Sequence, residues 1–186
     1  WSYFPIIVEY VNQGQNAFEG EAEHGNFTSA NGYPDEEIPG IPGWYDSIDG
    51  IVGEYLALLQ LGVGAYTLGV NSDDGFRATI GANYNDILTQ KIGVFEGARA
   101  AADSIFDIFV SEAGLYPFRV LWFENEGDAS IEIFSMVDGE KVLINDPDVE
   151  GSIKAYTPKG ATVDESITER DASTGRAAVV SIMPAP

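Results

Sequence analysis

Cysteine is absent from this sequence of 186 residues. Its absence excludes disulfide bonds, thiolate zinc sites and cysteine nucleophiles. It is compatible with a bacterial secreted protein that is stabilised by the size of its core or by calcium.

Motifs for catalysis and nucleotide binding are also absent. His24 is the single histidine, in a loop that also holds Glu21 and Glu23, and no G-x-S-x-G stretch supplies a serine nucleophile for it. We therefore expect His24 to be a solvated loop residue. Walker and G-x-G-x-x-G motifs are missing as well. Two carboxylates suffice for a glycosidase, and 30 acids leave that alternative open. We expect a non-catalytic protein, which could be joined to an enzyme.

Long apolar runs are missing too. No stretch approaches the length of a membrane helix, and the N-terminus lacks a basic and then apolar signal, so we expect no membrane insertion. The chain begins at Trp1 without a methionine. We therefore expect it to be part of a larger protein, covalently linked to neighbouring domains.

Basic residues are scarce. The chain has 30 acids and 9 bases, and Arg77 is the first base, after twelve acids. Such a surface repels polyanions, which excludes nucleic acid and anionic membranes as partners and favours divalent cations. The alternative for most of these acids is solubility in a salty or extracellular medium.

Short strand patterns and many turn residues make up most of the chain. Period-2 alternation between Gly-rich turns predicts an all-β fold, an antiparallel β-sandwich with long irregular loops. Asp107 and Glu132 are expected to face outward in their strands. The predicted strands are 3–10, 55–61, 65–71, 76–80, 105–110, 115–123, 130–136 and 141–144.

Other segments interrupt this pattern. Residues 20–50 are too rich in Gly, Pro and acid for regular structure, and a loop of this length is usually functional or held by its own packing. One helical turn is possible at 97–105. We expect the sandwich domain to span 1–157 and 158–186 to be a linker or the start of a following module. Within that tail, 177–183 is either a last strand or part of a neighbour.

Asp73 and Asp74 stand side by side in the stretch GVNSDDGFRATIG. Adjacent carboxylates repel each other unless a cation lies between them, and hard cations such as Ca²⁺ take oxygen ligands. Both could reach one ion if the peptide bond between them were cis, at a cost of about 3–4 kcal/mol that calcium binding could offset. An ordinary β-turn is the alternative, because Ser-Asp-Asp-Gly suits one well.

Three other stretches offer oxygen atoms or a modification site. Asp146, Asp148, Glu150 and Gly151 match the opening of an EF-hand loop, but Thr157 stands at the twelfth position, so we expect an acidic turn. The loop 123–130 is also rich in oxygen. Asn26 begins an Asn-Phe-Thr glycosylation sequon, a pattern common by chance.

Three stretches in this order resemble a PA14 domain: GAYTLGVNSDDGFRATIG, AGLYPFRVLWFENEGDASIEIF and SMVDGEKVLI, covering about residues 52–144. The shared features are a strand entering a Ser-Asp-Asp-Gly turn and a later Gly-x-Tyr-Pro that opens a long strand. The stretches also look like a variant found in large secreted proteins of environmental bacteria. The resemblance implies a β-sandwich of jelly-roll type at the cell surface or outside the cell.

In its adhesin branch, the resemblance implies a Ca²⁺ site that binds glycan hydroxyls. Carried over, it makes Asp73 and Asp74 the acidic ligands and Asn125 the amide ligand, with main-chain carbonyls of Gly127 and Ala129. The second loop departs from the adhesin spacing by about one residue, and its Glu124, Glu126 and Asp128 make it more acidic. Candidate contacts to the glycan, some of them aromatic rings that would pack on a sugar face, are Asn71, Arg77, Tyr84, Trp44, Tyr45 and Asp128; Trp122 is expected in the core.

The sequence therefore predicts a calcium-dependent carbohydrate-binding module. A calcium-stiffened structural or adhesive spacer that binds no sugar is the alternative.

Overall fold

The computed structural model describes residues 6–15, 23–38, 49–81, 83–84, 88–158 and 179–184. The only helical segment in these ranges is the 3₁₀ turn η1 (Ser29–Asn31). The strands are β1 (Ile6–Ile7), β2 (Asn12–Gly14), β3 (Glu36–Glu37), β4 (Ile51–Leu61), β5 (Gly64–Asp73), β6 (Gly75–Ile80), β7 (Gln90–Phe95), β8 (Ala102–Val110), β9 (Gly114–Glu124), β10 (Ser130–Val137), β11 (Glu140–Leu143), β12 (Ala155–Tyr156) and β13 (Val179–Pro184).

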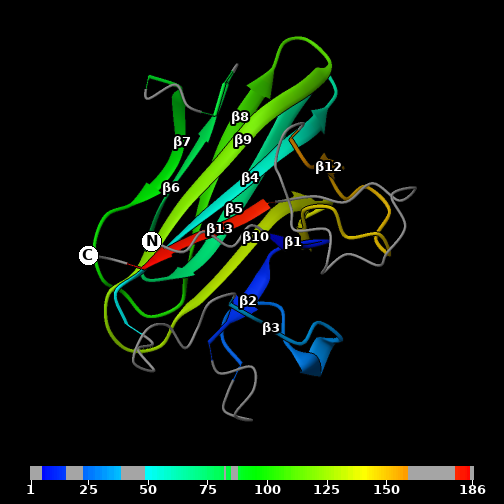
Figure 1. Cartoon of the computed structure of the whole chain (residues 1–186). Helices are drawn as coiled ribbons and strands as arrows, with labels where there is room; N and C mark the ends of the chain where they lie inside the picture. The colour runs from blue at the N-terminus through cyan, green and yellow to red at the C-terminus, as the bar shows by residue number, and fades with distance from the viewer. Residues whose placement is uncertain are drawn as a thin grey trace.

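The strands form two sheets that pack face to face (Figure 1). The first sheet has the order β1-β13-β4-β9-β6-β7, with β12 also paired to β4. The second has the order β3-β2-β10-β5-β8, with β11 paired to β10. All described pairings are antiparallel except that of β2 with β3. The predicted all-β antiparallel sandwich is confirmed.

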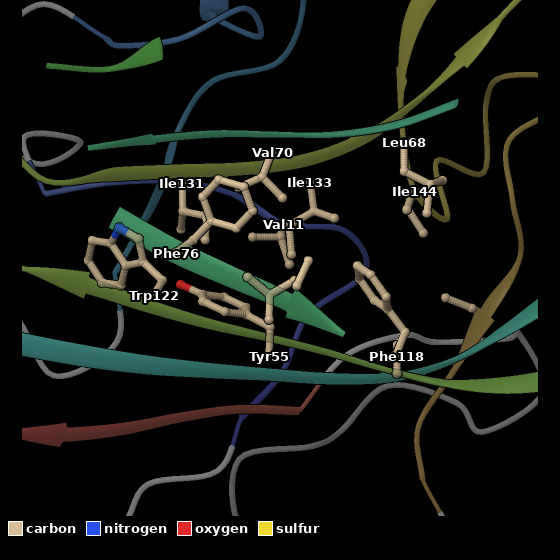
Figure 2. Close-up of a cluster of buried hydrophobic side chains, with 14 of the residues drawn as sticks. Val11, Tyr55, Leu68, Val70, Phe76, Phe118, Trp122, Ile131, Ile133 and Ile144 are labelled. Atoms are coloured by element: carbon tan, nitrogen blue, oxygen red, sulfur yellow. The ribbon is translucent and has the colours of Figure 1, made fainter. Parts of the chain in front are cut away.

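The core lies between the sheets and follows from the alternation in the strands. Odd-numbered residues of β4 and, from Phe118 onward, even-numbered residues of β9 are buried, so Tyr55 and Trp122 face the core. They meet Val70 of β5 and Ile131 of β10, as Figure 2 shows. Trp122 is 1% exposed, so its predicted place in the core is confirmed.

The structure corrects one expectation about a segment. The stretch 97–105 forms no helical turn: residues from Ala102 onward belong to β8, which pairs with β5 over nine positions. Residues 179–184 form β13 and pair with β4 from Leu56 to Ile51, in agreement with the alternative of a last strand in this part of the tail. The intervening residues 159–178 lie outside the described ranges, and the domain boundary at 157 stays a prediction.

Four strand ends meet at one end of the sandwich. Ile51 at the start of β4 pairs with Glu124 at the end of β9. Asp73 at the end of β5 pairs with Ser130 at the start of β10. The ends of the two sheets therefore bring the segments around 49, 73 and 124–130 together. Within the described ranges, no helix is both long and apolar enough to span a bilayer.

Candidate functional site

Asp73 and Asp74, which we call the Asp corner, lie where the chain passes from one sheet to the other. β5 ends at Asp73 in the second sheet and β6 begins at Gly75 in the first. The peptide bond between the two acids is cis, as the cation hypothesis expected. Because β5 and β6 belong to different sheets, the pair does not connect two paired strands as the turn of a hairpin would. Asp73 is 8% exposed and Asp74 is 2% exposed.

Main-chain N–H groups fix the Asp74 carboxylate. Its Oδ1 accepts a hydrogen bond from Arg99 N at 2.8 Å, and its Oδ2 accepts one from Asn125 N at 3.0 Å. The main-chain carbonyl of Asp73 accepts a hydrogen bond from the indole Nε1 of Trp122 at 2.9 Å. Asp74 therefore links the segment before β8 to the loop after β9. The buried Trp122 links the Asp corner to the core.

The loop of residues 125–129 faces the Asp corner and is held from both sides. Gln15 donates from Nε2 to Gly127 O and from its main-chain N to Ala129 O, both at 2.9 Å. On the other side, Gly127 N donates to Asp49 Oδ1 at 3.3 Å, and Gly50 N donates to Asn125 O at 3.1 Å. The two carbonyl oxygens implied as cation ligands are thus positioned, and each keeps a second lone pair.

Asn125 meets the Asp corner through its backbone. Its main-chain N–H contacts Asp74, while the residue as a whole is exposed. The structure therefore brings together Asp73, Asp74 and the 125–129 loop, as the sequence predicted. That these groups bind a metal stays a prediction.

Glu124 is the feature of this end that the predicted ligand set omits. It is 1% exposed, and among the described residues no group makes a well-formed hydrogen bond to either carboxylate oxygen, although the nearby Gly50 N–H lowers its pKa slightly. Burial, reinforced by the charges of Asp49, Asp74 and Asp73, raises its pKa to about 7. An unpaired buried carboxylate is costly unless a proton or a cation neutralises it. The environment therefore suits a positive charge.

The negative charge of the Asp73 carboxylate is destabilised in the same way. Burial and the charge of Asp74, followed by that of Asp128, raise its pKa to about 6. In the described residues, no three His, Cys, Asp or Glu side chains converge as a ready metal group. A cation at the corner would thus draw on two carboxylates together with carbonyl and amide oxygens. All of these are hard oxygen donors, which fit Ca²⁺ and not a soft metal.

Arg99 is a further residue of this end that sequence analysis did not identify. Its guanidinium lies 4.2 Å from the centroid of the Phe95 ring. It donates from Nε to Ser72 O at 3.0 Å and from Nη2 to Ser72 Oγ at 2.8 Å. It thus braces the residue before the Asp corner. Only the scarcity of bases in the sequence could have drawn attention to it.

The other predicted contact residues are dispersed. Asn71 is 4% exposed and donates from Nδ2 to Asp103 Oδ1 at 2.8 Å. Arg77 is exposed on the outer face of the first sheet, paired with Val94 and Leu121.

Tyr84 donates its hydroxyl to Ala57 O at 3.0 Å, in the middle of β4 and away from the Asp corner. Asp128 is exposed on the 125–129 loop, with its Oδ2 3.7 Å from His24 Nε2. Trp44 and Tyr45 lie outside the described residues.

The rival acidic stretch 145–151 forms a turn after β11. Asp146 is 1% exposed, and its Oδ2 accepts a hydrogen bond from the Tyr33 hydroxyl at 2.7 Å. Its Oδ1 accepts one from Asp148 N at 2.9 Å, which closes the turn locally. Both oxygens of this carboxylate thus have protein partners, in contrast to those of Glu124.

Comparisons with known proteins give structural similarity only. No protein-family model and no curated protein matches the sequence. The A domain of Epithelial Adhesin 9 from Candida glabrata, solved with Galβ1-4GlcNAc, is 12% identical with a TM-score of 0.47, covering 73% of this chain and 64% of that one. The PA14 domain of the MpAFP antifreeze protein is 19% identical with a TM-score of 0.38, covering 75% of this chain and 66% of that one.

A subtype-switched form of the same adhesin domain, from the same organism and solved with β-lactose, is 13% identical with a TM-score of 0.46. That match covers 73% of this chain and 62% of the adhesin chain, so this chain spans less than two thirds of the adhesin structures. A PA14 domain is among the matches. TM-scores below 0.5 say nothing about which ligand this chain binds.

Proposed function

We propose that this chain is a non-catalytic, calcium-dependent carbohydrate-binding module of a larger secreted or surface protein. The observation that supports it is the buried Asp corner facing a loop of positioned carbonyl oxygens, with the unpaired Glu124 carboxylate beside it. Three buried acids at one end of a sandwich destabilise the fold unless positive charge neutralises them. These three acids are therefore stable together only when a positive charge is bound beside them.

The residues of the chain have distinct roles in this proposal. Asp73 and Asp74 hold Ca²⁺, together with Asn125 and the carbonyls of Gly127 and Ala129. Bound calcium supplies open coordination positions for two neighbouring hydroxyl groups of a glycan. The two N–H donors fix the orientation of the Asp74 carboxylate, and Trp122 fixes the main-chain carbonyl of Asp73.

Titration with Ca²⁺ and glycan tests this function. The wild-type protein is expected to bind Ca²⁺ in isothermal titration calorimetry and to be retained on immobilised glycans until EDTA is added. Asp74→Asn keeps the shape but removes one charge, and we expect it to lose both calcium binding and glycan retention. Asp107→Asn is a matched control, because Asp107 is an exposed-side acid of β8 that accepts a hydrogen bond from Thr67 Oγ1. Glycan binding that persists unchanged in EDTA would refute the proposal.

The alternative function is a calcium-stiffened spacer without sugar binding. It is favoured by one observation: the two oxygens of Asp74 accept from N–H groups of two separate loops. A cation at this point would fasten both loops to the Asp corner. This function predicts a higher melting temperature in Ca²⁺ and no retention on any glycan.

A further inference from the structure

Residues 23–31, which we call the strap, lie against the outer face of the second sheet. The strap is fastened by Glu132, whose Oε1 accepts hydrogen bonds from Asn26 N at 2.7 Å and Phe27 N at 2.9 Å. The Asn26 side chain donates from Nδ2 to Glu132 Oε2 and to Asp103 Oδ1, both at 2.8 Å. Lys141 completes the network by donating to the Asn26 and Asp103 oxygens.

Apolar packing also holds the strap. Phe27 is 5% exposed and stacks edge-on against Tyr33, with ring centroids 5.5 Å apart. Its ring also lies against Phe134 of β10, with centroids 6.3 Å apart. Gly25 has a positive φ of 91°, and a Cβ there would run into the Glu132 carboxylate, so the chain passes directly over that acid. A segment with this many buried contacts holds its position.

The strap places His24 at the Asp corner. His24 Nε2 lies 3.7 Å from Asp128 Oδ2 on the 125–129 loop. The His24 side chain is 26% exposed and that of Asp128 is 54% exposed, so the pair is accessible from solvent. The charges of both residues act on the Asp73 carboxyl, which is itself part of the corner. The single histidine is therefore part of the rim of the candidate site and not an isolated, solvated loop residue.

A sugar bound at the Asp corner would need a hydrogen-bond donor from the protein for its acceptor oxygens. Carboxylates and carbonyls only accept hydrogen bonds, and they dominate this end of the sandwich. A sugar also presents oxygen atoms that only accept, such as its ring oxygen or the carbonyl of an acetamido group. The Arg99 guanidinium is engaged with Ser72 and Ser104. His24 offers a ring N–H at the exposed side of the corner.

We propose that His24 determines glycan specificity by donating a hydrogen bond to an acceptor oxygen of the sugar held at the Asp corner, with Asp128 orienting its imidazole. This inference rests on the proposed function, because it needs a glycan at the corner. It assigns His24 a contact with the sugar and none with the cation.

Two substitutions at His24 distinguish the effect of its N–H donor from the effect of its flat ring. His24→Phe keeps a flat ring but removes the N–H, and His24→Gln replaces the ring with an amide that can still donate. The probes are galactose, N-acetylgalactosamine, mannose and N-acetylglucosamine, each immobilised and tested with calcium. We expect His24→Phe to lower affinity for the retained sugars about tenfold, the usual effect of one hydrogen bond. His24→Gln should stay within about threefold of wild type.

Calcium titrations and melting curves of the same variants distinguish the outcomes. Both His24 variants should bind Ca²⁺ as wild type does and melt at the same temperature, whereas Asp74→Asn should lose calcium. If wild type is retained and His24→Phe keeps its affinity and its preference among the four sugars, the role of His24 is refuted and the proposed function stands. A wild-type protein that binds calcium but none of the four sugars would overturn both.

Discussion

At the residue scale, Asn26 shows how a short polar side chain holds a long segment in place. Both hydrogens of its amide nitrogen are engaged, one with Asp103 and one with Glu132. We expect Asn26→Ala to destabilise the fold by about 2–4 kcal/mol, because it removes one hydrogen-bond donor from the buried Glu132 carboxylate and one from the Asp103 carboxylate. Urea denaturation measures this cost.

Thr67→Ala is the matched control for that substitution. It removes a single side-chain hydrogen bond to Asp107 on the exposed side of β8. The expected cost is about 0.5 kcal/mol or less. Equal costs for the two variants would contradict the structural role of Asn26. Because its amide is fully engaged, we also expect the Asn-Phe-Thr sequon to stay unmodified in the folded protein.

Residue chemistry also explains which parts of the site could be predicted. The Asp73–Asp74 pair stood out in the sequence because adjacent acids in a turn are unusual. Glu124 did not stand out, although it has the same strand parity as Trp122 and so had to face inward. The pairing of His24 with Asp128 joins residues far apart in the chain. No local pattern predicts such a contact.

At the scale of elements, the strands with apolar alternation and the short β11 were predicted, whereas β2, β3, β7 and β12 were missed. β4, β5, β8, β9 and β10 lie where the apolar alternation placed them. β2 consists of Asn12, Gln13 and Gly14, and its pairing with β10 and with β3 makes it a strand. Glu132 faces outward from its sheet as predicted, yet it is buried, because the strap covers it. A pattern of one strand does not reveal what covers its outer face.

Gly69 of β5 packs so closely against Phe134 of the neighbouring β10 that a side chain at this position would force a shift. A Cβ at this position would lie on the ring of Phe134, closer than real Cβ atoms come to another atom. Phe134 is fully buried beneath the strap, where its ring packs against Phe27. We expect Gly69→Ala to cost about 1–3 kcal/mol, the usual effect of overpacking. Thermal unfolding measures it.

Gly114→Ala at the start of β9 provides the matched control. The nearest atom to a Cβ there is Tyr116 Cε2 at 3.7 Å, an ordinary contact. Its expected effect is within about 0.5 kcal/mol. If the two alanine variants have the same melting temperature, the close approach of Phe134 to β5 is contradicted.

At the scale of the whole molecule, the excess of acid becomes a dependence of stability on pH. The formal net charge is −21 at pH 7. Among the described residues, five acids have pKa values raised chiefly by burial. In four of them the increase is large: the pKa of Asp35 and of Asp73 rises to about 6, and that of Glu124 and of Glu132 to about 7, while that of Glu36 is raised as well. Their ordinary values are 3.8 for Asp and 4.5 for Glu. Between those two ranges the folded state binds protons that the unfolded chain has already released.

The sign of the effect follows from this difference in bound protons. Where the folded state binds more protons, the free energy of unfolding falls as pH rises. In EDTA, we therefore expect the melting temperature to be at least about 5 °C higher at pH 5 than at pH 8. Glu132→Gln removes one of the four groups and should reduce this difference, whatever its effect at a single pH.

Calcium should raise the melting temperature more at pH 8 than at pH 5, because protons and the cation neutralise the same acids at the Asp corner. Calorimetry at both pH values, with EDTA or calcium, measures all three effects, and a melting temperature in EDTA that falls on acidification from pH 8 to pH 5 would contradict the electrostatic account of this fold.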